Sequence, residues 1–189
     1  MKPDIGIITN IGNSHLEKLK NIEGVFKVKS ELIKNIRKGG TLIVPNNEKF
    51  LKRWIKMSKG VSVVPVPKDF IAVNEKVSRT KKIMTFDIIL SSQVNKKSTS
   101  VSVTSSLIGK HNIQNILFCY ECLRVLGESN TRMLKVLKNI STSVLRQKII
   151  EWKNKSTLID DTYNANPESV KRSIDAVSYT HLTLPTTPV

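Results

Sequence analysis

Two short apolar runs, DIGIIT at residues 4–9 and TLIVP at residues 41–45, flank a segment with the spacing of an amphipathic helix. Short runs rich in β-branched residues are typical of strands that are buried in a parallel sheet. Between the two runs, four apolar residues recur at helical intervals: Val25, Val28, Leu32 and Ile36. Gly39-Gly40 then ends the helical pattern. The order of strand, helix and strand favours a wound α/β domain.

Further strand and helix patterns follow along the chain. The segments VSVVPV and FIAV predict additional strands. KIMTFDIIL and TSVSVTSSLI alternate in polarity on either side of the polar stretch SSQVNKKS, which predicts an antiparallel hairpin. Helical spacing returns over residues 111–126 and 131–140. The sequence therefore predicts an α/β fold with a mostly parallel sheet, helices and an antiparallel hairpin.

A second unit begins near residues 145–156. Two more extended segments, KIIEW and STLID, lead into DTYNANPESVKRSIDAV. In that string Asn166 could cap a helix whose first residue is Pro167. We expect residues 1–145 to belong to one domain and residues 146–176 to open another.

The last residues, 177–189, differ in character from the rest. The string VSYTHLTLPTT resembles the translation of a transposon-type sequencing adapter, which would make this tail foreign to the natural gene. Its content of threonine and proline fits a disordered tail or an ordinary linker equally well. We assign the tail no function.

The chain is strongly basic. It has 31 Lys and Arg residues against 15 Asp and Glu residues, a net charge of +16. Such a charge favours polyanionic partners. The basic residues are spread along the whole chain, however, and form no compact block interleaved with stacking aromatic residues. We expect no nucleic-acid partner, and a basic nucleic-acid-binding module stays open as an alternative.

Apolar length and cysteine placement limit the other function classes. No apolar run approaches the roughly 20 residues of a membrane span, and MKPDIGIITN lacks the apolar core of a signal peptide. We therefore expect a cytoplasmic protein. We also expect the protein to be a monomer. Cys119 and Cys122 form a C-x-x-C within the apolar helical stretch NILFCYECLRVL, so we expect buried structural cysteines and not a redox or metal pair.

Four strings stand out along the chain: PDIGIITNIGNSHLE, EGVFKVKSELI, IGKHNIQNIL and LIDDTYNANPESV. Together they span almost all of residues 2–176, and in this order they resemble the Mur ligase family. The fourth has the form D-D-(S/T)-Y-N-A-N-P, typical of the D-alanyl-D-alanine-adding branch, whereas folate polyglutamylating relatives carry DGAHNP. The resemblance implies the later part of the central ATP-binding domain, followed by the first strand-helix unit of a Rossmann-like C-terminal domain.

The first two strings imply a magnesium site. By resemblance His15 would ligate the second Mg²⁺, although a lone loop histidine is more often a surface residue and Mg²⁺ prefers oxygen ligands. Lys29 occupies the position of a carbamylated lysine, in which CO₂ turns a cationic amine into an anionic oxygen ligand. The alternative for Lys29 is a solvated lysine on an amphipathic helix, because Lys27 and Lys34 look the same by composition.

The last two strings imply an ATP site. The residues that the resemblance assigns to the nucleotide are Asn115, Arg146, Asp161, Tyr163 and Asn164. Asn115 would meet adenine, because an amide can donate to and accept from a purine edge. Arg146 would approach the phosphates and Asp161 the ribose hydroxyls, with Tyr163 and Asn164 near the nucleotide at the domain junction. His111 and Asn112 could instead cap the helix that begins in this region.

The resemblance implies a parent enzyme with parts that these residues lack. No G-x-x-x-x-G-K-(S/T) string occurs, since Thr104 and His111 stand where Gly109-Lys110 would need a glycine and a hydroxyl residue. The acidic metal ligand and the UDP-sugar domain that the family places upstream are absent too. We therefore expect a fragment cut at both ends and inactive alone.

The implied parent is an ATP-dependent peptide ligase. It would join D-alanyl-D-alanine to UDP-N-acetylmuramoyl-tripeptide through an acyl phosphate, with ATP, Mg²⁺ and the Lys29 carbamate. A sibling Mur ligase or a folylpolyglutamate-type ligase is the alternative within the fold.

Overall fold

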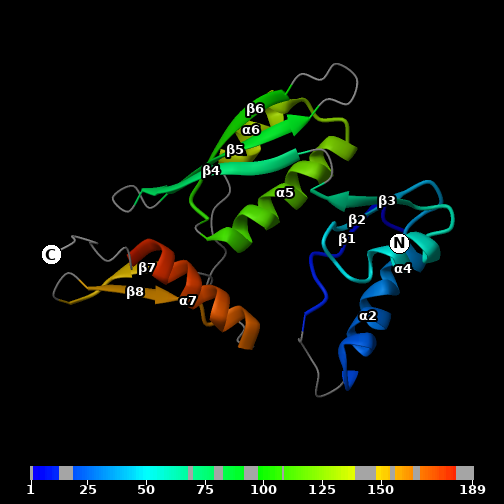
Figure 1. The fold of residues 1–189 in the computed structure, drawn as a ribbon, viewed down its shortest axis with the longest axis horizontal. Coiled ribbons are helices and arrows are strands. Elements are labelled where there is room, and N and C mark those ends of the chain that lie inside the picture. Colours follow the sequence, from blue (N-terminus) through cyan, green and yellow to red (C-terminus); the bar gives the residue numbers. More distant parts are fainter. Residues whose placement is uncertain are drawn as a thin grey trace, which may run out of the picture.

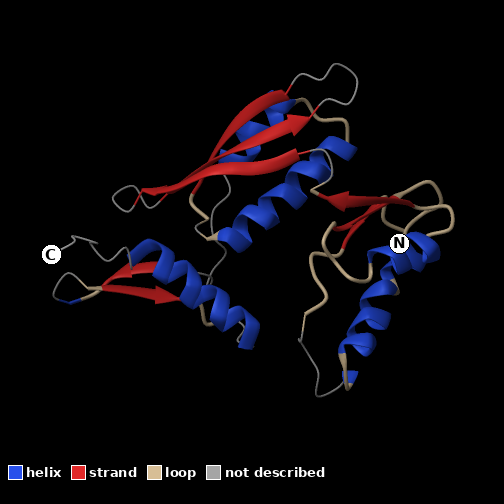
Figure 2. Ribbon diagram, viewed as in Figure 1, coloured by secondary structure: helices blue, strands red, loops and turns tan. Residues whose placement is uncertain are grey.

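The computed structural model describes residues 2–12, 19–67, 70–78, 83–91, 98–107, 109–138, 148–153, 156–163 and 167–181. Within those ranges the strands form three separate sheets (Figure 1). Helices accompany each sheet, so the fold is mixed α/β throughout (Figure 2).

The first sheet is parallel and has the order β1-β2-β3. Its strands are β1 (Ile5–Ile7), β2 (Thr41–Pro45) and β3 (Ser62–Val66). β2 pairs in parallel with both neighbours. The prediction that DIGIIT, TLIVP and VSVVPV lie side by side in one parallel sheet is therefore confirmed.

β2 is the most deeply buried strand of this sheet. Successive side chains of a strand point to opposite faces. Accordingly, Leu42 and Val44 belong to one hydrophobic cluster, whereas Ile43 belongs to another on the opposite face. All three side chains have no exposed area. Burial on both faces explains why this strand is apolar throughout.

Helices α2 (Ile22–Ser30), α3 (Leu32–Asn35) and α4 (Leu51–Met57) connect the strands of the parallel sheet. The structure corrects the expectation of a single helix up to Gly39, because α2 and α3 are separate and Ile36 has an extended backbone. Of the predicted core face, Val25 and Ile36 are buried as expected, but Val28 is 48% exposed. Phe26 and Ile33 are buried in addition. The sequence analysis did not predict α4.

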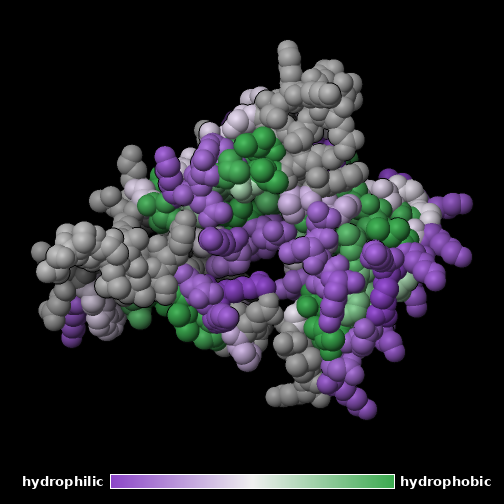
Figure 3. Space-filling model, in the orientation of Figure 1, coloured by the Kyte–Doolittle hydropathy of each residue, from purple (hydrophilic) through white to green (hydrophobic). Residues whose placement is uncertain are grey.

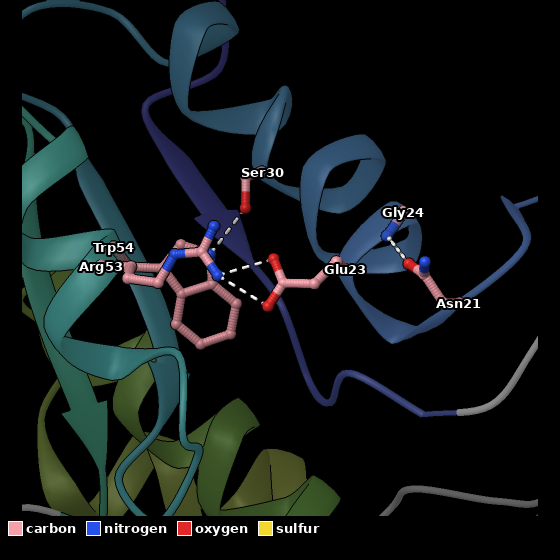
Figure 4. A network of polar contacts seen from close by, with 6 residues as sticks. All are labelled: Asn21, Glu23, Gly24, Ser30, Arg53 and Trp54. Carbon is pink, nitrogen blue, oxygen red and sulfur yellow. Dashed lines mark hydrogen bonds and ion pairs between the residues drawn. The ribbon is translucent and has the colours of Figure 1, made fainter.

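Contacts between α2 and α4 fix the two helices against each other (Figure 4). The buried indole of Trp54 donates from Nε1 to Ser30 Oγ at 2.9 Å. Arg53 Nη1 lies 2.9 and 2.7 Å from the two carboxylate oxygens of Glu23. The same guanidinium stacks 4.1 Å from the ring centroid of Phe26. α4 therefore holds α2 by a buried hydrogen bond, an ion pair and a cation–π contact.

The start of α2 requires a glycine. Asn21 caps the helix, because its side-chain oxygen accepts a hydrogen bond from the Gly24 amide at 3.0 Å. A Cβ on Gly24 would lie 2.1 Å from the Leu19 carbonyl oxygen. The loop that leads into α2 thus passes too close for any other residue at this position.

The second sheet is antiparallel, with strands β4 (Phe70–Ser78), β5 (Ile83–Ser91) and β6 (Ser98–Ser105). The predicted hairpin is confirmed as β5 and β6. The FIAV segment begins β4, which adds a third strand to the hairpin and takes no part in the parallel sheet.

α5 (Lys110–Val125) packs between the parallel and antiparallel sheets, and α6 (Asn130–Lys138) packs against β6. Ile116 and Leu117 of α5 share one hydrophobic cluster with Ile43 of β2 and Ile88 of β5. The two sheets are therefore joined through a common core, and α5 is the element that joins them (Figure 1).

The described residues after α6 form a further part of the fold, called the third unit here because it holds the third sheet; it contains β7 (Lys148–Glu151), β8 (Thr157–Asp160) and α7 (Pro167–His181). KIIEW and STLID form these two strands, which pair antiparallel. Pro167 begins α7 as predicted, while Asn166 lies outside the described residues. α7 continues past Ala176 to His181, into the segment expected to be an adapter-derived or disordered tail, and residues 182–189 lie outside the described part.

The cysteines correct one expectation and support another. Cys119 is exposed, whereas Cys122 is partly buried against the core, and both are free thiols. Desolvation around each thiol raises its pKa, with a smaller contribution from the neighbouring Cys122 or Glu121. The prediction that Cys119 is buried is wrong, because Cys119 is exposed. The raised pKa of both thiols disfavours the reactive thiolate form.

None of the described helices combines the length and apolar character that crossing a bilayer requires.

Candidate functional site

A cleft of about 730 Å³ lies where the loops after β1 and β2 meet the start of α5 and the side of α7. Figure 3 shows a hollow between these parts, bordered by hydrophilic residues. Its lining residues are Thr9, Asn10, Ile11, Pro45, Asn47, Glu48, Lys110, His111, Gln114, Asn115, Arg172 and Asp175. Ligands of α/β proteins bind at the carboxyl ends of parallel strands, which is where the loops after β1 and β2 lie.

Lys29 points from α2 toward the loop that follows β1. Its Nζ donates to the Asn10 main-chain oxygen at 2.8 Å and to Asn10 Oδ1 at 3.1 Å. Lys29 is half-buried, whereas Lys27 and Lys34 are exposed. The structure thus separates Lys29 from the lysines that composition could not distinguish. His15, farther along the same loop, lies outside the described residues.

The loop after β2 contacts the loop after β1. The Ile11 backbone amide lies 3.3 Å from Glu48 Oε2, at the long end of hydrogen-bond distances. Ile11 is buried and belongs to the core on the α2 side of the parallel sheet. Asn10 and Ile11 are therefore both contacted by charged side chains from other segments.

The start of α5 supplies the third wall of the cleft. Gly109 occupies the N-cap position with φ of 111°, which favours glycine, and no side chain caps the helix there. His111 and Asn112 lie inside the helix, so the capping alternative is wrong for both. Asn115 lines the cleft, and its Nδ2 lies 3.5 Å from Asn112 Oδ1.

His111 connects the start of α5 to the third unit electrostatically. Burial lowers the pKa of His111, the cationic Arg172 lowers it further, and Asp161 opposes the change. The imidazole is therefore neutral at neutral pH. Asp161 is half-buried and accepts a hydrogen bond from Ser173 Oγ in α7. Asp161, in the DDTYNANP string, is thus close enough to the start of α5 to affect the charge of His111.

Other residues expected at the site are not brought into it by the described structure. Tyr163 is 62% exposed and is not among the cleft-lining residues. Arg146 and Asn164 lie outside the described residues.

The donor set of the cleft suits a magnesium ion only in part. Within the described ranges no three His, Cys, Asp or Glu side chains cluster as metal ligands. Oxygen donors, which Mg²⁺ prefers, are present on Thr9, Asn10 and Glu48. Mg²⁺ usually keeps several waters and takes few protein ligands, so carbamate oxygens on Lys29 beside this loop would fit its chemistry.

Sequence reasoning missed several cleft residues. Glu48 could have been found, because it closely follows a predicted buried strand whose carboxyl end should face a ligand. Arg172 and Asp175 could not, because only the tertiary position of α7 brings them to the cleft.

The comparisons with known proteins agree with this architecture. Residues 1–123 match the family model described as the Mur ligase middle domain. The UDP-N-acetylmuramoyl-tripeptide--D-alanyl-D-alanine ligase of Bacillus subtilis is 26% identical over 172 residues, which are 91% of this chain and 35% of that protein. The UDP-N-acetylmuramate--L-alanine ligase of Clostridium acetobutylicum is 28% identical over 186 residues, 95% of this chain and 38% of that protein.

A solved structure extends the similarity to three dimensions. The crystal structure of MurF from Acinetobacter baumannii superposes with a TM-score of 0.80 at 26% identity, covering 93% of this chain and 37% of that one. The chain thus spans a little over a third of the length of the curated relatives it matches, which are covered to 35% and 38%.

Proposed function

This chain belongs to the Mur ligase family through that family's middle domain, and we propose that it is part of an ATP-dependent ligase that joins D-alanyl-D-alanine to UDP-N-acetylmuramoyl-tripeptide. The observation that carries the proposal is the cleft, which brings Asn115 together with the loop that Lys29 contacts. The DDTYNANP string supports the D-alanyl-D-alanine-adding branch over its siblings.

The proposed reaction has two steps. The carboxylate of the tripeptide attacks the γ-phosphorus of ATP, which forms an acyl phosphate and releases ADP. The amine of D-alanyl-D-alanine then attacks the acyl carbon, loses a proton and expels phosphate. Negative charge on the transferring phosphoryl group dominates the barrier, so positioned cations and donors provide most of the catalysis.

The residues divide into a metal group and a nucleotide group. We assign the magnesium ion to His15 and the Lys29 carbamate; when bound, it would neutralise charge on the phosphoryl oxygens. The 2.8 Å contact of Lys29 with Asn10 supports this assignment, because it brings the amine to the loop that continues toward His15.

The nucleotide group comes from α5 and from the junction with the third unit. Asn115 would bind adenine, Asp161 the ribose hydroxyls and Arg146 the phosphates, with Tyr163 and Asn164 beside them. The exposure of Asn115 to the cleft and the position of Asp161 near His111 support the assignments of Asn115 and Asp161.

A sibling activity is the second candidate, since the L-alanine-adding relative matches with similar identity. The test uses the complete product of the gene in which this sequence lies. It is mixed with ATP, Mg²⁺ and either UDP-N-acetylmuramoyl-tripeptide with D-alanyl-D-alanine or UDP-N-acetylmuramate with L-alanine, and products are identified by mass spectrometry. We expect only the first mixture to yield ligated product with ADP. Product from the second mixture alone would establish the sibling activity instead.

A further inference from the structure

We propose that Glu48 is a positioning residue that holds the loop after β1 in place through the Ile11 backbone amide. The inference deepens the proposed function, on which it rests, because that loop continues toward His15 and contacts Lys29. Neither the family resemblance nor the composition of the chain singled out this glutamate.

The contact joins two segments that are far apart in the sequence. Glu48 Oε2 accepts from the Ile11 amide at 3.3 Å, and both residues line the cleft. A hydrogen bond to a carboxylate is stronger than one between neutral groups. A backbone amide held by a side chain fixes the path of the loop itself.

Glu48 can perform this role because its own backbone is anchored. Its carbonyl oxygen accepts a hydrogen bond from Leu51 N at the start of α4, at 3.0 Å. α4 is in turn tied to α2 by the buried bond between Trp54 and Ser30. The carboxylate therefore extends from a rigid support, which a positioning residue needs.

The loop is held at two adjacent residues by two different elements. Lys29 of α2 binds Asn10, and Glu48 of the loop after β2 binds Ile11. Fixing two consecutive residues restricts both the position and the direction of the loop at Asn10 and Ile11. Groups that orient a metal ligand typically change metal affinity by about 10- to 100-fold when removed.

The competing reading is that Glu48 acts on a bound ligand through its negative charge. Two substitutions separate the readings. Glu48→Gln removes the charge but keeps a side-chain oxygen that can accept from Ile11, whereas Glu48→Ala removes both. Glu31→Ala is the matched control, since Glu31 is an exposed glutamate outside the cleft.

The first measurement is amide hydrogen exchange at Ile11, in the complete gene product without ligands. We expect exchange to accelerate about tenfold in Glu48→Ala, which follows from losing one charged hydrogen bond. It should accelerate less in Glu48→Gln, which keeps a neutral acceptor, and be unchanged in Glu31→Ala. Unchanged exchange in Glu48→Ala would overturn the proposal, whether or not the protein proves to be a ligase.

The second measurement is the Mg²⁺ concentration that gives half-maximal ligation. We expect it to rise about tenfold in Glu48→Ala and less than about threefold in Glu48→Gln. Suppose that Glu48→Gln needs as much Mg²⁺ as Glu48→Ala, while exchange of the Ile11 amide in Glu48→Gln stays slower than in Glu48→Ala. Then the negative charge of Glu48, and not its hold on Ile11, determines Mg²⁺ dependence, and the proposal fails. Absence of ligation in the unsubstituted protein would instead refute the proposed function and leave the exchange result standing.

Discussion

At the scale of single residues, Lys29 differs from its neighbours by what its amine contacts. Lys27 and Lys34 are exposed, while Lys29 Nζ lies within 3.1 Å of two oxygens of Asn10. If the lysine acts as a carbamate, Lys29→Arg keeps the positive charge but cannot take up CO₂. We expect both Lys29→Ala and Lys29→Arg to lower kcat of the complete gene product by at least about a hundredfold, in a steady-state ligation assay.

Chemical rescue gives this prediction its control. Acetate could enter the cavity left by Lys29→Ala and supply carboxylate oxygens, so partial recovery at high acetate is expected there and not in Lys29→Arg. The alanine change at Lys27 should have little effect. Near-normal activity of Lys29→Arg in CO₂-depleted buffer would show that Lys29 is only a solvated cation.

His111 predicts a dependence of stability on pH. Its pKa is lowered in the folded chain, first by burial and then by Arg172, so the folded state binds fewer protons than the unfolded state. This contribution to stability is complete above the unfolded value of about 6.5 and is lost as pH falls through the folded pKa. Thermal melting between about pH 5 and 7.5 should show a smaller loss in His111→Gln than in the parent chain. His15→Gln is the control substitution and should lose as much thermal stability at low pH as the parent chain. A loss in His111→Gln as large as that in the parent chain would contradict the assignment to His111.

At the scale of elements, the packing of α2 on α4 depends on one buried hydrogen bond. Ser30 is 2% exposed and Trp54 is fully buried, so Ser30→Ala would leave the indole N–H without an acceptor. We expect the free energy of unfolding to fall by about 1–3 kcal/mol, measured by urea denaturation.

Ser58 provides the matched control for that prediction. It is also buried, but within the described part of the chain its Oγ has no hydrogen-bond partner. Ser58→Ala should therefore change the free energy of unfolding far less than Ser30→Ala. Equal effects of the two substitutions would mean that volume, and not the bond to Trp54, determines the cost.

The elements also show what sequence could and could not predict. Buried strands such as Thr41–Pro45 were predictable because their apolar runs are short and end at turn residues. α4 was missed because its seven residues bury only Trp54, which leaves no helical repeat to detect. Val28 matched the helical period yet is exposed, since periodicity alone does not specify where the core lies around the axis.

The site was predictable to the extent that it lies in local strings. Asn115 lines the cleft and is carried by one continuous motif, GKHNIQN, so sequence alone could single it out as a candidate. Arg172 reaches the cleft only through the position of α7, and no local pattern encodes that position.

At the scale of the whole molecule, the net charge of +16 gives a test of the nucleic-acid alternative. We expect binding to duplex DNA at low salt that shows no sequence preference and falls by several orders of magnitude between about 50 and 200 mM salt. Fluorescence anisotropy with two unrelated duplexes, and heparin as competitor, measures this. Retained, sequence-selective binding at about 200 mM salt would favour a nucleic-acid-binding role.

The burial of β2 on both faces has a consequence for how the molecule unfolds. Leu42 and Val44 contribute to one core and Ile43 to the other, so neither core can open while β2 stays paired on both sides. The described elements from β1 to α6, which the two cores connect, should therefore lose structure in one cooperative step. None of the described residues of β7, β8 and α7 belongs to either cluster, so this part can melt in an earlier, independent transition. That transition would remove the α7 wall of the cleft while its remaining walls persist.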